Sequence, residues 1–288
     1  MGFLVGILTG FFTSVGNNQL KKLAGVPASF IVSNQFVIGT IMLAIAVSLF
    51  GNWELPPLAF FALLVILTTI EYLNSYIYAR ALQLSPQSLV GPLYSLSVVF
   101  LAPLGILFLG ETPNMSGWLG IILSVVGSLL LGFDTGDPGI RPAVRALLRE
   151  RGSYFMLGSA LLSAVAVILT KFSYVSVPPL LSGFWIYVGL TVISTGIAFR
   201  RGLPVVSKEL SMPFLYLLLA TGFGVVFHYI GLALIPAAYF IACKRSSVLF
   251  DVVLGRVVHG ETHFRSRLLG AFVMFVGVLL VMFSGRTF

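Results

Sequence analysis

A fifty-residue segment occurs twice in this chain, at positions 84–133 and again at 234–283. Aligned without a gap, the two copies are identical at 18 of 50 positions. A bias toward apolar residues would match Leu and Val pairs, but the identities also include a proline, a Gly-Glu-Thr triplet and three further glycines. The same shift of 150 positions aligns Lys21 with Lys171. The chain is therefore an internal duplication, and its function is expected where the two halves meet.

The composition is that of a membrane protein. The 288 residues are 58% hydrophobic and only 9% charged, with a mean hydropathy of +1.04, whereas a soluble domain carries about 25% charged residues. The net charge is +8, and the basic residues that produce it lie between apolar runs. They therefore indicate the orientation of the chain in the membrane rather than nucleic-acid binding. One cysteine excludes a disulfide framework. The first apolar run lacks the flanks of a cleaved signal peptide, and we expect it to be a retained span.

The lengths of the apolar runs predict an all-α integral membrane protein with ten transmembrane helices, because a bilayer core requires about 20 apolar residues per helix. Proline, glycine or basic residues mark most of the boundaries. The predicted spans are 2–20, 28–50, 58–80, 86–109, 114–133, 153–173, 179–199, 211–232, 236–258 and 264–284. This divides the chain into a first five-helix repeat (1–133), a basic connecting loop (134–152) and a second five-helix repeat (153–288).

The basic residues predict that the two repeats are inverted relative to each other. An odd number of spans per copy requires inversion, and positive charge marks the cytoplasmic side. Twelve Lys and Arg residues fall in connections that would share one side of the membrane, including the central loop, and the opposite side has Arg286 alone. Both termini are therefore expected to be extracytoplasmic, in a multi-pass protein of the cell (inner) membrane.

The paired segments FLGETPNMSGWLGIILSVVGSLLL and VVHGETHFRSRLLGAFVMFVGVLLV resemble the ends of the two halves in EamA-type ten-span proteins of the drug/metabolite transporter superfamily. The segment ARALQLSPQSLVGPLYSLSVVF resembles the entry into the fourth span of that family, and Lys22 and Lys171 resemble the lysine that closes the first span of each half. The resemblance covers nearly the whole chain. It implies a secondary transporter that exports or exchanges amino acids or similar compounds.

Lys244, Arg245 and Asp251, in the ninth predicted span, are the clearest candidates for substrate contacts. Ionisable residues at membrane depth usually face a bundle interior or a wet cavity. Snorkelling or structural pairing is the alternative, because Lys244 lies only about 12 Å from the start of the span at 1.5 Å per residue. Lys244 and Asp251 are seven residues apart and share a helix face, so the two charges could partly neutralise each other. The cations favour a substrate with a carboxylate or phosphate group.

Glu71 is the second candidate. A buried carboxylate can load and release a proton, as a proton-coupled carrier requires, or it can form a fixed salt bridge with Lys244 or Arg245. Glu71 could also bind an amine, and Asp251 is a further candidate for coupling. His228 could relay protons, but a lone histidine in an apolar helix is more often a packing residue.

Other polar and aromatic side chains could line a small-molecule pocket, although hydrogen bonding between helices or packing explains each of them equally well. These residues are Asn17, Asn18, Tyr72, Asn74, Tyr78, Tyr94, Trp185 and Tyr239.

Glu111 and Glu261 are interpreted as structural rather than catalytic. Each follows a glycine that stops a helix and precedes a threonine suited to capping the next helix, which predicts a tight hairpin. The paired glycines of the fifth and tenth spans, seven residues apart in each, predict a helix-packing or dimer contact.

No catalytic, cofactor or metal motif occurs in the chain. We therefore predict a transporter rather than an enzyme, acting by alternating access around a central cavity. Its expected partners are a small-molecule substrate, the lipid bilayer and a coupled proton or counter-substrate, without nucleic acid, in a monomer or homodimer. A flippase for lipid or lipid-linked substrates and a non-transporting scaffold are the alternatives.

Overall fold

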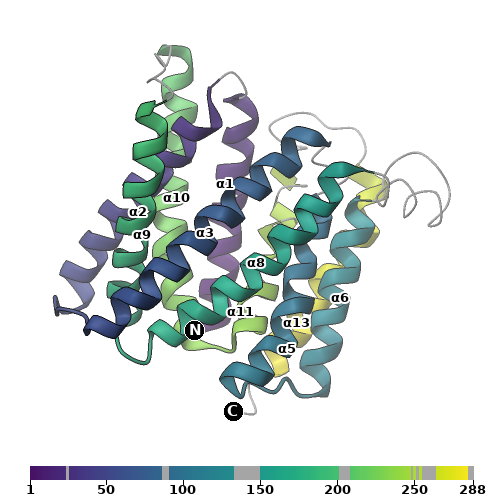
Figure 1. Ribbon diagram of the computed structural model, residues 1–288. Helices are drawn as coiled ribbons and strands as arrows, with labels where there is room; N and C mark the ends of the chain where they lie inside the picture. Colours follow the sequence, from purple (N-terminus) through teal and green to yellow (C-terminus); the bar gives the residue numbers. More distant parts are fainter. Residues whose placement is uncertain are drawn as a thin grey trace.

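The structure, a computed structural model, describes residues 1–23, 26–85, 91–132, 150–200, 208–247, 249–250, 253–254 and 264–284. Within these residues all the regular structure is helical (Figure 1). The first half contains α1 (Gly2–Lys22), α2 (Ala28–Phe50), α3 (Leu58–Leu84), the 3-10 helix η1 (Gly91–Leu96), α5 (Ser97–Leu109) and α6 (Met115–Gly132). The second half contains α8 (Arg151–Ser173), α9 (Pro179–Arg200), α10 (Lys208–Leu234), α11 (Ala237–Lys244) and α13 (Phe264–Ser284). The helices lie within a few residues of the predicted ranges, except in the fourth and ninth.

Five of these helices are long and apolar enough to cross a membrane, and each has an 18-residue window with a mean hydropathy of at least 1.2. They include residues 29–50, 58–78, 151–173, 179–200 and 210–234. Large apolar side chains also remain exposed along the bundle, as expected of surfaces that face lipid. The chain is therefore a multi-pass membrane protein, and ten spans remains a prediction.

The helix ends follow the expected turn chemistry, with one correction. Gly110 ends α5 in the left-handed region (φ 67°), and the N–H of Glu111 donates to the carbonyl of Gly105 at 3.1 Å. The predicted glycine stop is thus confirmed. The predicted cap at Thr112 is wrong, because α6 begins later and Asn114 caps it. The Oδ1 of Asn114 accepts the N–H of Gly117 at 2.9 Å.

The contacts between helices repeat in symmetric pairs, as a duplication requires. The contact of α1 with α10 recurs between the halves as the contact of α3 with α8. The contact of α1 with α11 recurs as that of α8 with η1 and α5. Two further pairs, α2 with α9 and α6 with α13, join equivalent helices directly. The halves are thus related by an approximate two-fold axis that passes between these pairs.

The first helices of the two halves run in opposite directions. At one end of the bundle, Gly2 at the start of α1 packs against Ile235. The Nζ of Lys171, near the end of α8, donates to the carbonyl of that same Ile235 at 2.9 Å. The start of one helix therefore lies beside the end of its repeat counterpart, which is the geometry of an inverted repeat. The start of α1 and the end of α13 both lie near this same end of the bundle (Figure 1).

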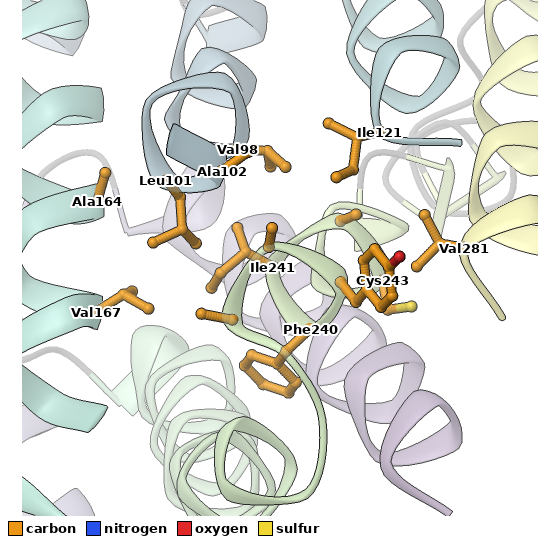
Figure 2. Close-up of a cluster of buried hydrophobic side chains, with 14 of the residues drawn as sticks. Val98, Leu101, Ala102, Ile121, Ala164, Val167, Phe240, Ile241, Cys243 and Val281 are labelled. Carbon is orange, nitrogen blue, oxygen red and sulfur yellow. The ribbon is translucent and has the colours of Figure 1, made fainter. Parts of the chain in front are cut away.

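Short helix α11 occupies the centre of the packed core. All residues from Ala237 to Cys243 are buried. Figure 2 shows Phe240, Ile241 and Cys243 of this helix among apolar side chains from α5, α6, α8 and α13. Such a helix is held by helices of both halves, so its position depends on how the halves fit together.

Glycines bring α6 and α13 into backbone contact. A Cβ at Gly120 would lie 2.7 Å from the carbonyl oxygen of Gly277, and one at Gly127 would lie 2.7 Å from that of Gly270. A Cβ at Gly127 would also collide with the backbone nitrogen of Met274. The predicted role of these glycines in helix packing is confirmed, and the contact lies within one chain.

We expect Gly127→Ala to lower the melting temperature of the purified protein, because neither backbone at this contact can move aside independently. Gly158→Ala on α8 is a matched control, since a Cβ there would meet nothing within 4 Å. In a helix, alanine is favoured over glycine by about 1 kcal/mol, so the control should be neutral or stabilising. Equal melting temperatures for both variants in detergent would contradict the packing role of Gly127.

Candidate functional site between the two repeats

The fourth helix of each half is irregular at the same place in the repeat. We expected continuous helices over 86–109 and 236–258. In the structure, residues 91–96 instead form the 3-10 helix η1, and α11 ends at Lys244, where the N–H of Ser246 donates to the carbonyl of Cys243 at 3.0 Å. A shift of 150 places 91–96 on 241–246. Interrupted helices at equivalent positions of two halves are the usual location of transporter binding sites.

Helix α1 packs directly against the break at the end of α11. A Cβ at Gly10 would lie 2.8 Å from the carbonyl oxygen of Lys244 and 2.7 Å from the Oγ of Ser246. One turn earlier, Gly6 makes the same close approach to Cys243. With Gly2, these residues form a pattern of glycines spaced four apart, which lets two helix backbones meet. This spacing is visible in the sequence and could have indicated the contact.

Arg245 reaches from α11 into the first half of the chain. Its Nη2 donates to the Oγ of Ser97 at 2.6 Å, and its guanidinium carbon lies 4.2 Å from the centre of the Tyr94 ring. The ring of Tyr78 lies 5.0 Å from that of Tyr94 and its hydroxyl also interacts electrostatically with Arg245. A cation above an aromatic face is stabilised by the ring quadrupole. Arg245 therefore joins α11 to η1, α5 and α3.

Lys244 points toward α10 instead. Its Nζ lies 3.4 Å from the Nδ1 of His228, whose ring packs edge-on against Phe240. The charge of Lys244 also interacts with that of Glu71 on α3, although the two form no salt bridge. The side chain is thus directed toward other residues of the bundle. An ammonium group has three donors, so this arrangement leaves Lys244 able to bind further acceptors.

Glu71 lies on a polar face of α3. Glu71, Asn74 and Tyr78 are spaced three and four residues apart and so share one side of the helix. The Oε2 of Glu71 accepts a hydrogen bond from Asn74 at 3.3 Å, and Asn74 in turn accepts one from Ser159 of α8 at 2.6 Å. The charge of Glu71 also interacts with Tyr187 of α9 and Tyr229 of α10. Glu71 of α3 thus lies near Lys244 of α11, while the adjacent Arg245 contacts η1 and α5.

The structure does not bring every predicted residue to this place. Tyr72 joins only the periphery of the site, through an apolar cluster with Tyr187 and Tyr229. Trp185 lies against Phe61 and Phe184, and its buried Nε1 has no hydrogen-bond partner among the residues that the structure describes.

Tyr239 is fully buried, and its hydroxyl contacts Ser284 at 2.8 Å. Asn17 and Asn18 lie near the far end of α1, where the Nδ2 of Asn18 donates to the carbonyl of Ser14. Asp251 lies outside the described residues.

Several residues of the site were not singled out from the sequence. Ser97 is identical to its repeat counterpart Ser247, and this identity inside a divergent segment was the available signal. Ser159 and Tyr229 carry no such signal, because small and aromatic residues occur throughout apolar helices. Among the described residues, no group of three His, Cys, Asp or Glu side chains could hold a metal ion.

Glu111 does more than close a hairpin. Its carboxylate pairs with the ammonium of Lys171 at the end of α8, and its Oε2 accepts the N–H of Ala237, the first residue of α11, at 2.6 Å. A carboxylate at a helix N-terminus satisfies a free N–H group and interacts favourably with the helix dipole. Lys171 also binds the carbonyl of Ile235. Glu111 of the first half therefore holds two helices of the second half.

The comparisons with known proteins agree with this architecture. The model of the EamA-like transporter family matches residues 1–133 and 150–283. The chain belongs to the EamA-like transporter family. A relative from Sinorhizobium sp, named as an uncharacterized transporter in the cobO 3′ region, is 34% identical over 130 residues, which cover 43% of this chain and 86% of that protein. A solved crystal structure aligns over 98% of both chains with a TM-score of 0.80 and 14% identity, which shows a shared fold.

Membership of this family makes the chain a transporter of the drug/metabolite transporter superfamily. The resemblance of the two Gly-Glu-Thr segments to those of EamA-type proteins is therefore confirmed. In family and fold, the protein is a membrane transporter built from two related halves.

We expect Glu111→Gln to destabilise the protein, because the 12%-exposed Lys171 would lose its anionic partner. Leaving one buried charge unpaired costs about 3–5 kcal/mol. The double variant Glu111→Gln with Lys171→Met should recover part of the loss in melting temperature. Additive losses in the double variant would show that the two residues do not act as a pair.

Proposed function

We propose that this protein is a secondary transporter that exports or exchanges small carboxylate-bearing metabolites, such as amino acids. The observation that carries the proposal is the cationic pair Lys244 and Arg245 at the break of α11, with Glu71 facing it from α3. The substrate would bind between the halves, and alternating access would follow from their rocking around this position.

The energetics of burial support a binding role for the pair. Two adjacent cations in the centre of an apolar bundle are costly unless anions or dipoles compensate them. The described neighbours supply one carboxylate, one imidazole, one hydroxyl and two tyrosines. These neighbours leave a net positive charge around the break, which a carboxylate substrate would neutralise. Glu71 would in turn face the amine of an amino acid.

Coupling to protons is the second part of the proposal. Glu71 has a hydrogen-bond donor in Asn74 and no salt bridge to either cation. A carboxylate without a fixed ion pair can change its protonation during a transport cycle, whereas a salt-bridged one would stay charged. We therefore assign Glu71 the role of proton carrier.

For localisation we propose the cell (inner) membrane with both termini extracytoplasmic. Lys22, Arg80, Arg151 and Arg200 all lie at or near helix ends on the side of the bundle away from Gly2. Lys171 lies at the same end as Gly2, where Glu111 neutralises it. Positive charge marks the cytoplasmic side. A C-terminal reporter enzyme that is active only in the cytoplasm should be silent, and a strong signal would reverse the orientation.

Neutralising a substrate-binding cation should weaken binding without unfolding the protein. A charge-assisted contact contributes roughly 1.5–3 kcal/mol, or about ten- to a hundred-fold in affinity. We expect Lys244→Met and Arg245→Met each to lose that much affinity for a carboxylate found by thermal-shift screening of the purified protein. Arg200→Met removes a cation at the end of α9 and should bind as the wild type does. Unchanged affinity in both of the first two variants would contradict the proposal.

Glu71→Gln mimics the protonated carboxyl group. It should abolish substrate accumulation driven by a proton gradient in liposomes while sparing exchange of labelled for unlabelled substrate. Glu54→Gln changes an exposed carboxylate in the loop before α3 and is the control. Gradient-driven accumulation at the wild-type rate by Glu71→Gln would remove Glu71 from the coupling mechanism.

A further inference from the structure

Ser97 is the first residue of α5 and is only 1% exposed. Its Oγ accepts the 2.6 Å hydrogen bond from the Nη2 of Arg245 that joins the two halves. The Tyr94 ring lies against the face of the same guanidinium group. A planar group that is hydrogen-bonded along one edge and stacked on one face has little freedom to rotate. Ser97 and Tyr94 together therefore fix the orientation of Arg245.

This orientation leaves part of the guanidinium group without a partner. The Nε of Arg245 is buried and makes no hydrogen bond to a described residue, and the same holds for the Oγ of the adjacent Ser246. Buried donors without acceptors destabilise a structure, so they are rare and call for an explanation. An incoming oxygen acceptor would satisfy them. Since both atoms are closed off in this conformation, the acceptor requires a local opening at the break of α11.

The contact of Arg245 with Ser97 and Tyr94 has no equivalent among the described residues of the other half of the chain. The counterpart of Arg245 in the first half is Ser95, and its Oγ makes a 2.6 Å hydrogen bond with Ser128 of α6. The first half thus closes the same position with a short neutral bond. The second half replaces it with a cation that crosses to the other repeat. This change in chemistry lies where the broken helices meet.

We propose that Ser97 is a positioning residue, which with Tyr94 holds Arg245 so that its unpartnered Nε–H is oriented to receive the carboxylate of the substrate. This inference rests on the proposed function, because it assumes that Arg245 binds the substrate. Arginine recognises a carboxylate with two parallel N–H groups, and this recognition depends on orientation far more than a lysine contact does. Ser97 therefore sets selectivity for planar acids without touching them.

The test measures the affinity of purified variants for acetate, succinate, L-glutamate and inorganic phosphate by thermal shift, with succinamide as the uncharged probe. We expect Ser97→Ala to weaken binding of the best carboxylate about tenfold, the effect of one charge-assisted hydrogen bond. Ser97→Thr keeps the hydroxyl and should restore most of the affinity. Ser95→Ala is the matched control, because it also removes a buried 2.6 Å bond but not one to Arg245; its affinity should equal that of the wild type.

A second background separates positioning from general packing. Arg245→Lys keeps the charge but lacks the planar fork, so adding Ser97→Ala to it should cause no further loss. The same loss in both backgrounds, an equal loss in Ser95→Ala, or wild-type affinity in Ser97→Ala would each overturn the inference. If Lys244→Met and Arg245→Met bind the probes as the wild type does, the proposed function fails instead, and the role of Ser97 fails with it.

Discussion

The carboxylate of Glu111 joins the two halves at one end of the bundle. It belongs to the hairpin that closes the fourth helix of the first half, and it binds both the end of α8 and the start of α11. Lys171 completes the contact through the carbonyl of Ile235, beside which α1 also begins. Four helices from both repeats thus meet around one ion pair. These groups satisfy one another and hold the halves in register at this end of the bundle.

From that fixed end, α11 enters the core and stops after eight residues. At this break the structure departs from a simple helical bundle. The charged residues Lys244, Arg245 and Glu71 lie around it. Helix α1 approaches it through glycines, α10 contributes His228, α3 contributes Glu71, and η1 with α5 hold Arg245. Interrupted helices expose backbone and side-chain polar groups at membrane depth, which proteins tolerate where a cavity or a ligand uses them. Membership of the EamA-like transporter family makes the protein a transporter. A role of this arrangement in transport, and the identity of the transported compound, are proposals.

Much of this architecture could be predicted from the sequence, because run length and punctuation by Pro and Gly fix where an apolar helix begins and ends. The repeat predicted two related five-helix halves, and the positions of the basic residues predicted their inversion. The break after Lys244 was missed because the polar run 244–247 was counted as part of one continuous span over 236–258. In the structure, α1 packs against this break at Gly10. The roles of Ser97 and Glu111 could not be predicted, because each arises from contacts between residues far apart in sequence. Local signals identified the charged candidates, whereas their partners required the fold.

The central claim is that the substrate binds between the two repeats, where their broken fourth helices meet. Determining the structure of the protein by electron cryomicroscopy with a transported carboxylate bound tests it most directly. The account predicts ligand density beside Lys244 and Arg245, with Glu71 facing it from α3 and with contacts from both halves. Density at any other position, or a complex in which these side chains keep only their present neighbours, would contradict it.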